Sequence, residues 1–145
     1  MTSSRPCPAF FLACLLACTL PGPDAAHAAH PAPSASTSLS PTESAIIART
    51  NEARARRGLP PLVADASLMA GARRQAGWMA RNRTMAHGQG VTENIAMGQS
   101  SASEAVASWM RSDGHRANIL ASHGRIGVAV AHAADGTAYW CQQFR

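Results

Sequence analysis

Two histidines and one glutamate in the middle of the sequence are the side chains whose types and spacing could do chemistry. They are His87, Glu93 and His115. Two neutral imidazoles and a carboxylate suit Zn²⁺ with one position left open for water. The same trio could act as general acid and base without a metal, because histidine titrates near neutral pH and the pKa of a sheltered glutamate can be raised towards it. A structural role is the third interpretation, in which His115 braces a helical turn and Glu93 accepts backbone amides.

The spacing of this trio requires separate segments to bring its members together. It is not the His-Glu-x-x-His pattern, in which both histidines project from one helix. Helices that could do the positioning are predicted from their caps. Ser40, Pro41 and Glu43 combine a capping box with a proline in the first turn, which predicts a helix over residues 41–57. Asp65 is the predicted N-cap of a second helix.

Each of these two helices is predicted to bury one stripe of side chains. In the second helix, Met69 and Trp78 are expected to widen the buried stripe. The arginines of the first helix are expected to face water. These are Arg49, Arg54, Arg56 and Arg57.

The second half of the chain is predicted to add one helix, a helical turn and a hairpin. Ser101 caps the third helix, and the helical turn follows over residues 115–120. Residues 126–132 and 137–144 have the alternation of two paired strands. Because a two-stranded ribbon is not stable alone, we expect it to pack on the helices with a third strand over residues 93–97.

The other aromatic and imidazole side chains are assigned structural roles. Trp109, Trp140 and Phe144 are expected in the core and not on a binding platform. His123 is expected at the surface and His132 at the end of a strand. Neither histidine is a first choice as a ligand.

Composition limits the classes of partner. The chain has 145 residues and a net charge of +5, and all 13 of its basic residues are arginine. This length holds one domain after an N-terminal leader, and no second domain fits. A mildly basic surface could favour anionic envelope polymers or lipid headgroups. Clustered basic residues interleaved with exposed aromatics are missing from the sequence pattern, so we predict no nucleic-acid partner.

The N-terminal sequence is typical of an export signal. Residues 1–28 contain Arg5, an apolar run and an Ala-x-Ala site ending at Ala28, which predicts a signal peptide. The alternative is a lipoprotein signal over residues 1–17, followed by an acylated Cys18 that anchors the chain to a membrane. Both interpretations predict an extracytoplasmic domain, either secreted or periplasmic, with a lipid anchor in the second.

The domain itself is predicted to span residues 41–145, after a linker rich in proline, alanine and serine at residues 29–40. Cys141 is the only cysteine of that domain, so no disulfide can form within it. It lies in a strand pattern and is predicted to be a small buried apolar residue.

The motifs of this domain, taken in order, carry a family resemblance. They are Asn51-x-x-Arg54-x-x-x-Gly58-Leu59-x-x-Leu62, an alanine-rich second helix, His87, Glu93-Asn94-Ile95-Ala96, Trp109-Met110-x-Ser112-x-Gly114-His115-Arg116 and the final hairpin. Together they resemble the CAP superfamily of cysteine-rich secretory proteins, antigen 5 and pathogenesis-related 1 proteins, and in particular its short bacterial branch. The resemblance implies an α+β fold, an α-β-α sandwich with a small antiparallel sheet between helical layers. It also implies a cleft holding two histidines and acidic residues.

The resemblance assigns the family's site residues by position. His87 matches the first histidine, Glu93 the glutamate of the Glu-Asn motif and His115 the second histidine. These three are the candidate ligands of a divalent metal such as Zn²⁺ and the candidates for catalysis. The fourth family position departs, because Ser112 stands where eukaryotic members have a glutamate. Glu104 is explained by the cap of the third helix and is not assigned to the site.

We therefore expect an exported binding or interaction module and not an enzyme. Its expected ligand is a divalent metal or a small apolar molecule, and its expected partner is a cell-envelope component or a lipid. This follows from the resemblance, since the family is known more for scaffolding, lipid or sterol binding and signalling than for a shared reaction. The alternative is a hydrolase of cell-envelope peptide or glycan, with Glu93 or a histidine as base. The missing fourth acid weakens that alternative.

Overall fold

A computed structural model describes residues 38–145 of the chain. The predicted signal peptide, the alternative acylation site at Cys18 and most of the predicted linker lie outside these residues. The described part folds into four helices and four strands: α1 Pro41–Ala55, β1 Val63–Ala64, α2 Ala66–Asn82, β2 Thr92–Met97, α3 Ala102–Arg111, α4 Asp113–Leu120, β3 Arg125–His132 and β4 Ala138–Phe144. Among residues 38–145, no helix has the length and apolar character needed to cross a membrane.

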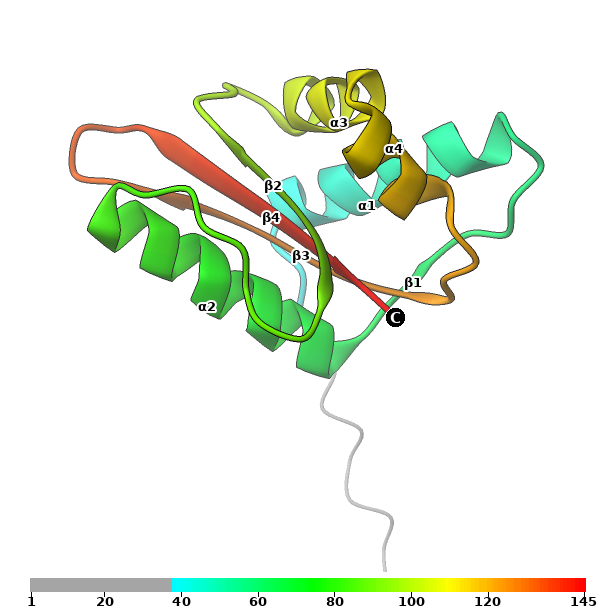
Figure 1. The fold of residues 1–145 in the computed structure, drawn as a ribbon, viewed down its shortest axis with the longest axis horizontal. Coiled ribbons are helices and arrows are strands. Elements are labelled where there is room, and N and C mark those ends of the chain that lie inside the picture. The colour runs from blue at the N-terminus through cyan, green and yellow to red at the C-terminus, as the bar shows by residue number, and fades with distance from the viewer. Residues whose placement is uncertain (1–37) are drawn as a thin grey trace, which may run out of the picture. The chain divides into compact units, whose positions relative to one another are not determined.

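The strands form one mixed sheet between two layers of helices (Figure 1). The strand order is β1-β3-β4-β2, in which β1 pairs with β3 in parallel and the other two pairs are antiparallel. Helix α2 covers one face, over β3 and β4, while α1, α3 and α4 lie on the other face. The predicted α-β-α sandwich, hairpin and third strand are therefore confirmed. The short β1 adds a parallel edge that the sequence pattern did not indicate.

Local caps explain where the first two helices begin. Ser40 Oγ accepts from the Glu43 amide at 3.2 Å, and Glu43 Oε2 accepts from the Ser40 amide at 2.8 Å. At the start of α2, Asp65 Oδ1 accepts from the amides of Ser67 and Leu68 at 3.0 Å. Both predicted caps are confirmed. The capping oxygens accept hydrogen bonds from amides of the first turn, which have no partners within the helix.

The core lies on both faces of the sheet. Trp109, Trp140 and Phe144 are buried on the face covered by α1 and α3, as predicted. The opposite cluster contains small residues of α2 together with Cys141, which is fully buried, also as predicted. Small side chains allow α2 to approach β3 closely. The approach is tightest at Gly127, where an added Cβ would meet backbone atoms of α2.

Two predictions about burial are wrong. Trp78 was expected in the buried stripe of α2, but it is 42% exposed because it faces the loop before β2 instead of the sheet. Arg54 was expected to face water with the other arginines of the first helix, but only 1% of it is exposed. The other three arginines, Arg49, Arg56 and Arg57, are exposed as predicted.

Arg54 is buried because its guanidinium group satisfies backbone carbonyls from two other segments. Its Nη1 donates to the carbonyls of Ile119 and Ala121 at 2.7 and 2.8 Å. Its Nε donates to Pro60 O at 3.0 Å, and its Nη2 donates to His123 O at 3.3 Å. The last carbonyls of a helix have no intrahelical donors and attract positive charge, so Arg54 fixes the end of α4 to α1.

Candidate functional site

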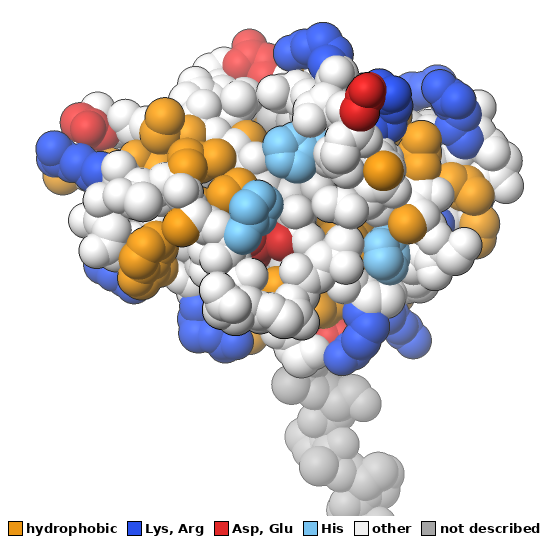
Figure 2. All heavy atoms as spheres, in the orientation of Figure 1, with side chains coloured by type: hydrophobic (Ala, Val, Ile, Leu, Met, Phe, Trp, Pro, Cys, Tyr) orange, Lys and Arg blue, Asp and Glu red, His pale blue; other side chains and the backbone are white. Residues whose placement is uncertain are grey.

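The three predicted site residues come from three different segments. Glu93 is in β2, His87 is in the loop before it, and His115 is in the first turn of α4. The antiparallel pairing of β2 with β4 sets Glu93 opposite Gln143. Figure 2 shows two histidine side chains close together on one face of the molecule, with an acidic side chain recessed beside them.

The carboxylate of Glu93 is enclosed, with 1% of the side chain exposed. Its Oε1 accepts from the Gly88 amide at 2.9 Å and lies 3.1 Å from His87 Nδ1. Its Oε2 accepts from Gln143 Nε2 at 3.0 Å and lies 3.4 Å from Cys141 Sγ. Both oxygens therefore have partners from the protein, and the carboxylate connects the loop to the sheet.

Cys141 is not suited to nucleophilic chemistry. Burial raises the pKa of its thiol well above the usual range, and the neighbouring charge of Glu93 raises it further. The thiolate is the reactive form of cysteine, so this thiol stays protonated and unreactive. Its role is that of a small core residue that contacts Glu93.

The contact with Glu93 orients the ring of His87. A carboxylate only accepts hydrogen bonds, so Nδ1 of His87 carries the hydrogen in this pair. Nε2 is then the ring nitrogen left for a ligand, on a side chain that is 58% exposed. Carboxylates commonly orient ligand-binding imidazoles in this way. His87 also borders a cavity of about 240 Å³.

His115 lies near enough to His87 for the two rings to interact electrostatically. Burial lowers the pKa of His115, and electrostatic interaction with His87 lowers it further. Its imidazole is therefore neutral at neutral pH, which is the state that can accept a hydrogen bond or bind a metal. The backbone at His115 is fixed, because Asn94 Nδ2 donates to its carbonyl at 3.0 Å and Asn118 Nδ2 donates to Asn94 Oδ1 at 3.0 Å.

Asn94 is also one end of a buried row of polar side chains. Its Nδ2 donates to Gln142 Oε1 at 3.3 Å, and Gln142 Nε2 donates to Thr50 Oγ1 at 2.6 Å. Thr50 Oγ1 donates to Ile46 O at 2.8 Å within α1. This row links α1, the sheet and α4, so the segment that carries His115 rests on hydrogen bonds through the core.

The metal-binding capacity of the site is limited to its two imidazoles. Within residues 38–145, no three His, Cys, Asp or Glu side chains are arranged to hold a metal ion together. Glu93 is occupied by the donors described above, which leaves His87 and His115. Structural zinc sites use four protein ligands and catalytic sites usually use three. These residues do not fit a closed zinc centre, and they leave two imidazoles as the candidate ligands.

The remaining acidic and hydroxyl candidates do not join the site. Ser112 is exposed between α3 and α4, and its side chain makes no capping bond. Glu104 holds the start of α3, as predicted, since its amide donates to Ser101 Oγ at 3.2 Å. Its carboxylate accepts from the amide of Ser100 at 2.9 Å, and not from Ser101 as a full capping box would require.

The two other described histidines of the second half differ in burial. His132 is exposed at the end of β3, as predicted. The surface prediction for His123 holds only in part, because its ring stacks on Phe144 with centroids 5.3 Å apart and an interplanar angle of 20°. The ring is half-buried by this aromatic contact.

Sequence reasoning missed Gln143 and Gly71 as parts of the site. Gln143 donates to Glu93, and an added Cβ at Gly71 would meet the Gln143 amide and lie 3.3 Å from its Cδ. No local pattern marks either residue. The pairing register of β2 with β4 is the signal that identifies Gln143, and it becomes available only with the sheet.

Gly71→Ala is expected to destabilise the fold by about 1 kcal/mol or more, because the added methyl group displaces Gln143 from Glu93. Hydrogen bonds to charged groups contribute about 1.5–3 kcal/mol. The matched control is Gly77→Ala in the same helix, whose Cβ would meet only the mobile end of Arg81. That change should stabilise α2 by up to about 1 kcal/mol. Urea unfolding compares the two variants, and equal effects would contradict the proposed role of Gly71.

The free energy of unfolding is expected to fall as the pH is lowered from about 7.5 to 5.5. Burial lowers the pKa of His123, and the charge of Arg54 lowers it further. The unfolded state therefore takes up this proton first, so the loss begins as the pH falls through the unfolded pKa of about 6.5 and is absent well above it. Urea unfolding at several pH values measures the slope. His123→Gln should reduce it.

Known bacterial proteins resemble this chain over most of its described length. It is 33% identical over 130 residues to the uncharacterized protein YkwD of Bacillus subtilis (strain 168), covering 77% of this chain and 49% of that protein. An extracellular protein of Bacillus anthracis str. Ames that contains an SCP domain is 25% identical with a TM-score of 0.60, covering 76% of this chain and 45% of that one. The chain thus spans about half the length of these two relatives.

Two further solved structures share the fold at lower identity. An outer surface protein from Borrelia burgdorferi has a TM-score of 0.62 and 20% identity, covering 68% of this chain and 87% of that one. NaASP2, whose structure was solved with Zn²⁺, has a TM-score of 0.56 and 16% identity, covering 75% of this chain and 82% of that one. These likenesses bear on the fold alone.

Family membership follows from the sequence match together with this fold. Residues 47–144 match the cysteine-rich secretory protein family, also called CAP. The matched range begins in α1 and ends at the last residue of β4, so it includes all three predicted site residues. The chain belongs to the cysteine-rich secretory protein family.

Proposed function

We propose that this protein is an extracytoplasmic binding module whose ligand contacts the histidine pair, defined as His87 and His115. The support is the state of the two rings. His87 is oriented by Glu93 and presents its other ring nitrogen on an exposed side chain. His115 has a lowered pKa and a backbone fixed by Asn94, so it offers a neutral imidazole in a defined place.

The enclosed carboxylate of Glu93 is the observation that favours a binding role over catalytic turnover. A general base must come within hydrogen-bond reach of the proton that it removes, and a nucleophile must reach its electrophile. Glu93 is 1% exposed at its side chain and is held by the Gly88 amide and Gln143. It therefore acts on a ligand only through the ring of His87, as a positioning residue.

A divalent cation such as Zn²⁺ is the proposed ligand of the histidine pair. Two imidazoles leave most of its coordination positions to water or to a second ligand, so we expect exchangeable binding. The NaASP2 structure with Zn²⁺ shows that a protein of this fold was obtained with the ion. A ligand-oriented imidazole also explains why a buried carboxylate lies behind His87.

Calorimetric titration with zinc chloride tests the metal proposal. The His87→Ala/His115→Ala double variant should bind zinc at least about tenfold more weakly, since it removes both ligands. Glu93→Gln should weaken binding by about 10–100-fold, because outer-shell partners orient their ligands. His132→Ala, which removes an exposed histidine elsewhere, serves as the control. Equal zinc affinity in the wild type and the double variant would overturn the proposal.

Turnover is tested separately with cell-wall fragments and with casein. We expect the purified protein to leave both substrates unchanged. Hydrolysis that is abolished in a folded Glu93→Gln variant would replace the binding module with the hydrolase alternative. Circular dichroism of the variant provides the control for folding.

The proposed location is the secreted or periplasmic space, with a lipid anchor at Cys18 as the alternative to cleavage after Ala28. Support comes from relatives described as an extracellular protein and an outer surface protein. The intact mass of the protein recovered from its host distinguishes acylation from cleavage. The proposed partner is a cell-envelope component or a lipid, which solvent extraction and mass spectrometry of the same sample would identify.

A further inference from the structure

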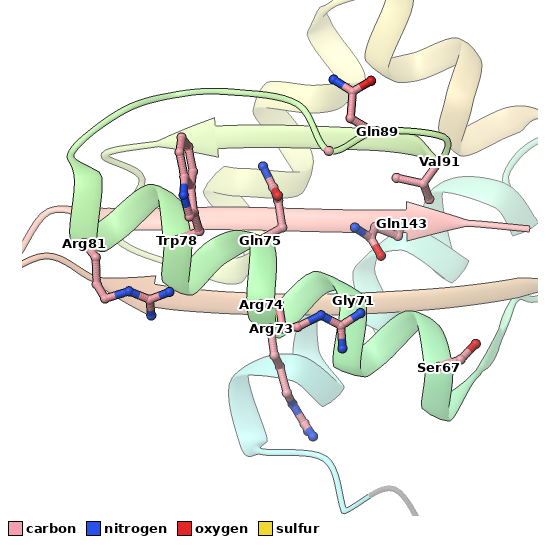
Figure 3. Close-up of a pocket in the computed structure, with 11 residues that line it drawn as sticks. Ser67, Gly71, Arg73, Arg74, Gln75, Trp78, Arg81, Gln89, Val91 and Gln143 are labelled. Carbon is pink, nitrogen blue, oxygen red and sulfur yellow. The ribbon is translucent and has the colours of Figure 1, made fainter.

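A groove of about 860 Å³ lies between α2 and the loop that precedes β2 (Figure 3). Its walls come from α2, from residues 88–91 and from Gln143 of β4. Neither member of the histidine pair lines it. The groove is therefore a second surface, and its chemistry can be considered independently of the proposed metal site.

The charge of the groove is positive and uncompensated. Arg74 and Arg81 line it, and no aspartate or glutamate does. Within residues 38–145, neither of these arginines forms an ion pair or donates a side-chain hydrogen bond. Arg73 also lines the groove, but its guanidinium group is paired, because it donates to Glu43 at 2.7 and 2.8 Å. Two free guanidinium groups remain, and such groups bind carboxylates in bidentate geometry.

The two free arginines flank an exposed indole on one stripe of α2. Arg74, Trp78 and Arg81 stand at i, i+4 and i+7, so they share a helix face. The rise of an α-helix separates the two arginines by about 10 Å. Figure 3 shows their guanidinium groups apart along α2, with Trp78 turned towards the opposite wall. A ligand along this stripe would meet a positive charge, a flat apolar ring and a second positive charge.

The rest of the lining favours hydroxyl groups over an acyl chain. Gln75 and Gln89 supply amides, which both donate and accept hydrogen bonds. Val91 is the only aliphatic side chain larger than alanine in the lining. A fatty acyl chain needs a mostly apolar pocket, which this groove does not provide. A sugar has hydroxyls for the amides and an apolar ring face for the indole.

We infer that this groove binds an acidic oligosaccharide, with carboxylates on Arg74 and Arg81 and a sugar ring stacked on Trp78. The separation of the arginines is near the length of a disaccharide unit, so carboxylates on alternate sugars can reach both of them. Gln75, Trp78, Gly88 and Gln89 also line the small cavity that His87 borders. His87 borders only that small cavity and does not line the groove, so the contacts with Arg74, Trp78 and Arg81 do not need it.

Binding of galacturonic acid hexamers to the purified full chain tests this inference. Trp78 is the exposed member of the three tryptophans, since Trp109 and Trp140 are buried, so a change in intrinsic fluorescence reports the groove. Maltohexaose is the uncharged control, and hexaglutamate and anionic phospholipid vesicles are the controls for charge without sugar. We expect the acidic hexamer to bind, and the three controls to bind at least about tenfold more weakly.

Matched variants locate the site. Arg74→Gln/Arg81→Gln should weaken binding of the hexamer by about tenfold or more for each arginine, from the usual strength of charge-assisted hydrogen bonds. Arg56→Gln/Arg57→Gln removes the same charge from exposed positions after α1 and should leave binding unchanged. Trp78→Ala should weaken binding and abolish the fluorescence change.

The outcomes separate this inference from the metal proposal. The His87→Ala/His115→Ala double variant should bind the hexamer as the wild type does, because neither histidine lines the groove. The inference is overturned if the hexamer does not bind, or if Arg74→Gln/Arg81→Gln binds it as tightly as the wild type. It is also overturned if hexaglutamate or vesicles bind as tightly as the hexamer, since the groove would then recognise charge or lipid and not an acidic sugar.

Discussion

The Arg54→Ala variant is expected to lose about 4 kcal/mol or more of its free energy of unfolding. The guanidinium group is buried and donates to the carbonyls of Ile119 and Ala121 at the end of α4. Alanine would leave these carbonyls without donors and open a cavity between α1 and α4. Unfolding in guanidinium chloride, followed by the fluorescence of the buried Trp109 and Trp140, measures the loss.

Two further substitutions separate charge from hydrogen bonding at this position. Arg54→Lys keeps the charge on a single nitrogen, which cannot replace the several N–H donors of the guanidinium group. It should therefore retain only part of the stability that Arg54→Ala loses. Arg57→Ala removes an exposed arginine just after α1 and should change stability by less than about 0.5 kcal/mol. If Arg54→Ala were as stable as Arg57→Ala, the anchoring of α4 through Arg54 would be wrong.

Gly127→Ala is expected to cost about 3 kcal/mol or more, at the upper end of the usual cost of overpacking. The added Cβ would overlap the carbonyl group of Leu68 and lie 2.5 Å from Met69 N. These are backbone atoms in the first turn of α2, so no side-chain rotation relieves the overlap. The helix must move away from β3, which loosens the packing of that whole face. Thermal unfolding should show a fall of about 12 °C or more.

Gly124→Ala is the control for this effect. It changes a glycine just before β3, and no atom lies within 4 Å of its added Cβ. We expect its melting temperature to differ from that of the wild type by no more than a typical surface substitution causes. A similar fall in both variants would mean that glycine flexibility, and not the close approach of α2, determines the stability of this edge.

Short-range signals predicted the helices and the hairpin of β3 and β4, but they did not predict β1. Caps such as Ser40 and Asp65 act on amides two or three residues away, so the sequence contains both partners. The alternation of β3 and β4 depends on consecutive side chains as well. The α-β-α sandwich and the α+β class were predicted from the family resemblance, and both are confirmed.

Long-range contacts caused the errors in burial. Arg54 looks like a solvated helix residue because three of its carbonyl partners lie far along the chain, at the end of α4 and just after it. Trp78 looks like a core residue because its apolar surface is large, yet the sheet is covered by the alanine-rich face of the same helix. Periodicity reports which residues share a face, but it does not report what lies opposite them.

The candidate site was predicted only in part, again because some of its contacts are long-range. The family resemblance singled out His87, Glu93 and His115, and the structure brings His87 onto Glu93 and His115 near His87. The partners Gln143 and Cys141 depend on the register of β4 beside β2, which no local motif specifies. The metal and binding roles of the trio stay predictions that the experiments above test.

The position of β4 in the sheet has a consequence for the order in which the protein can fold. This strand lies between β3 and β2 and buries all 7 of its residues, yet it follows both of them along the chain. A ribosome therefore makes β2 well before the strand with which it pairs. Until residues 138–144 emerge, Glu93 lacks both Gln143 and Cys141, and α2 has only part of a sheet to cover. Folding of this domain is thus expected to follow synthesis of its last strand and not to proceed step by step alongside it.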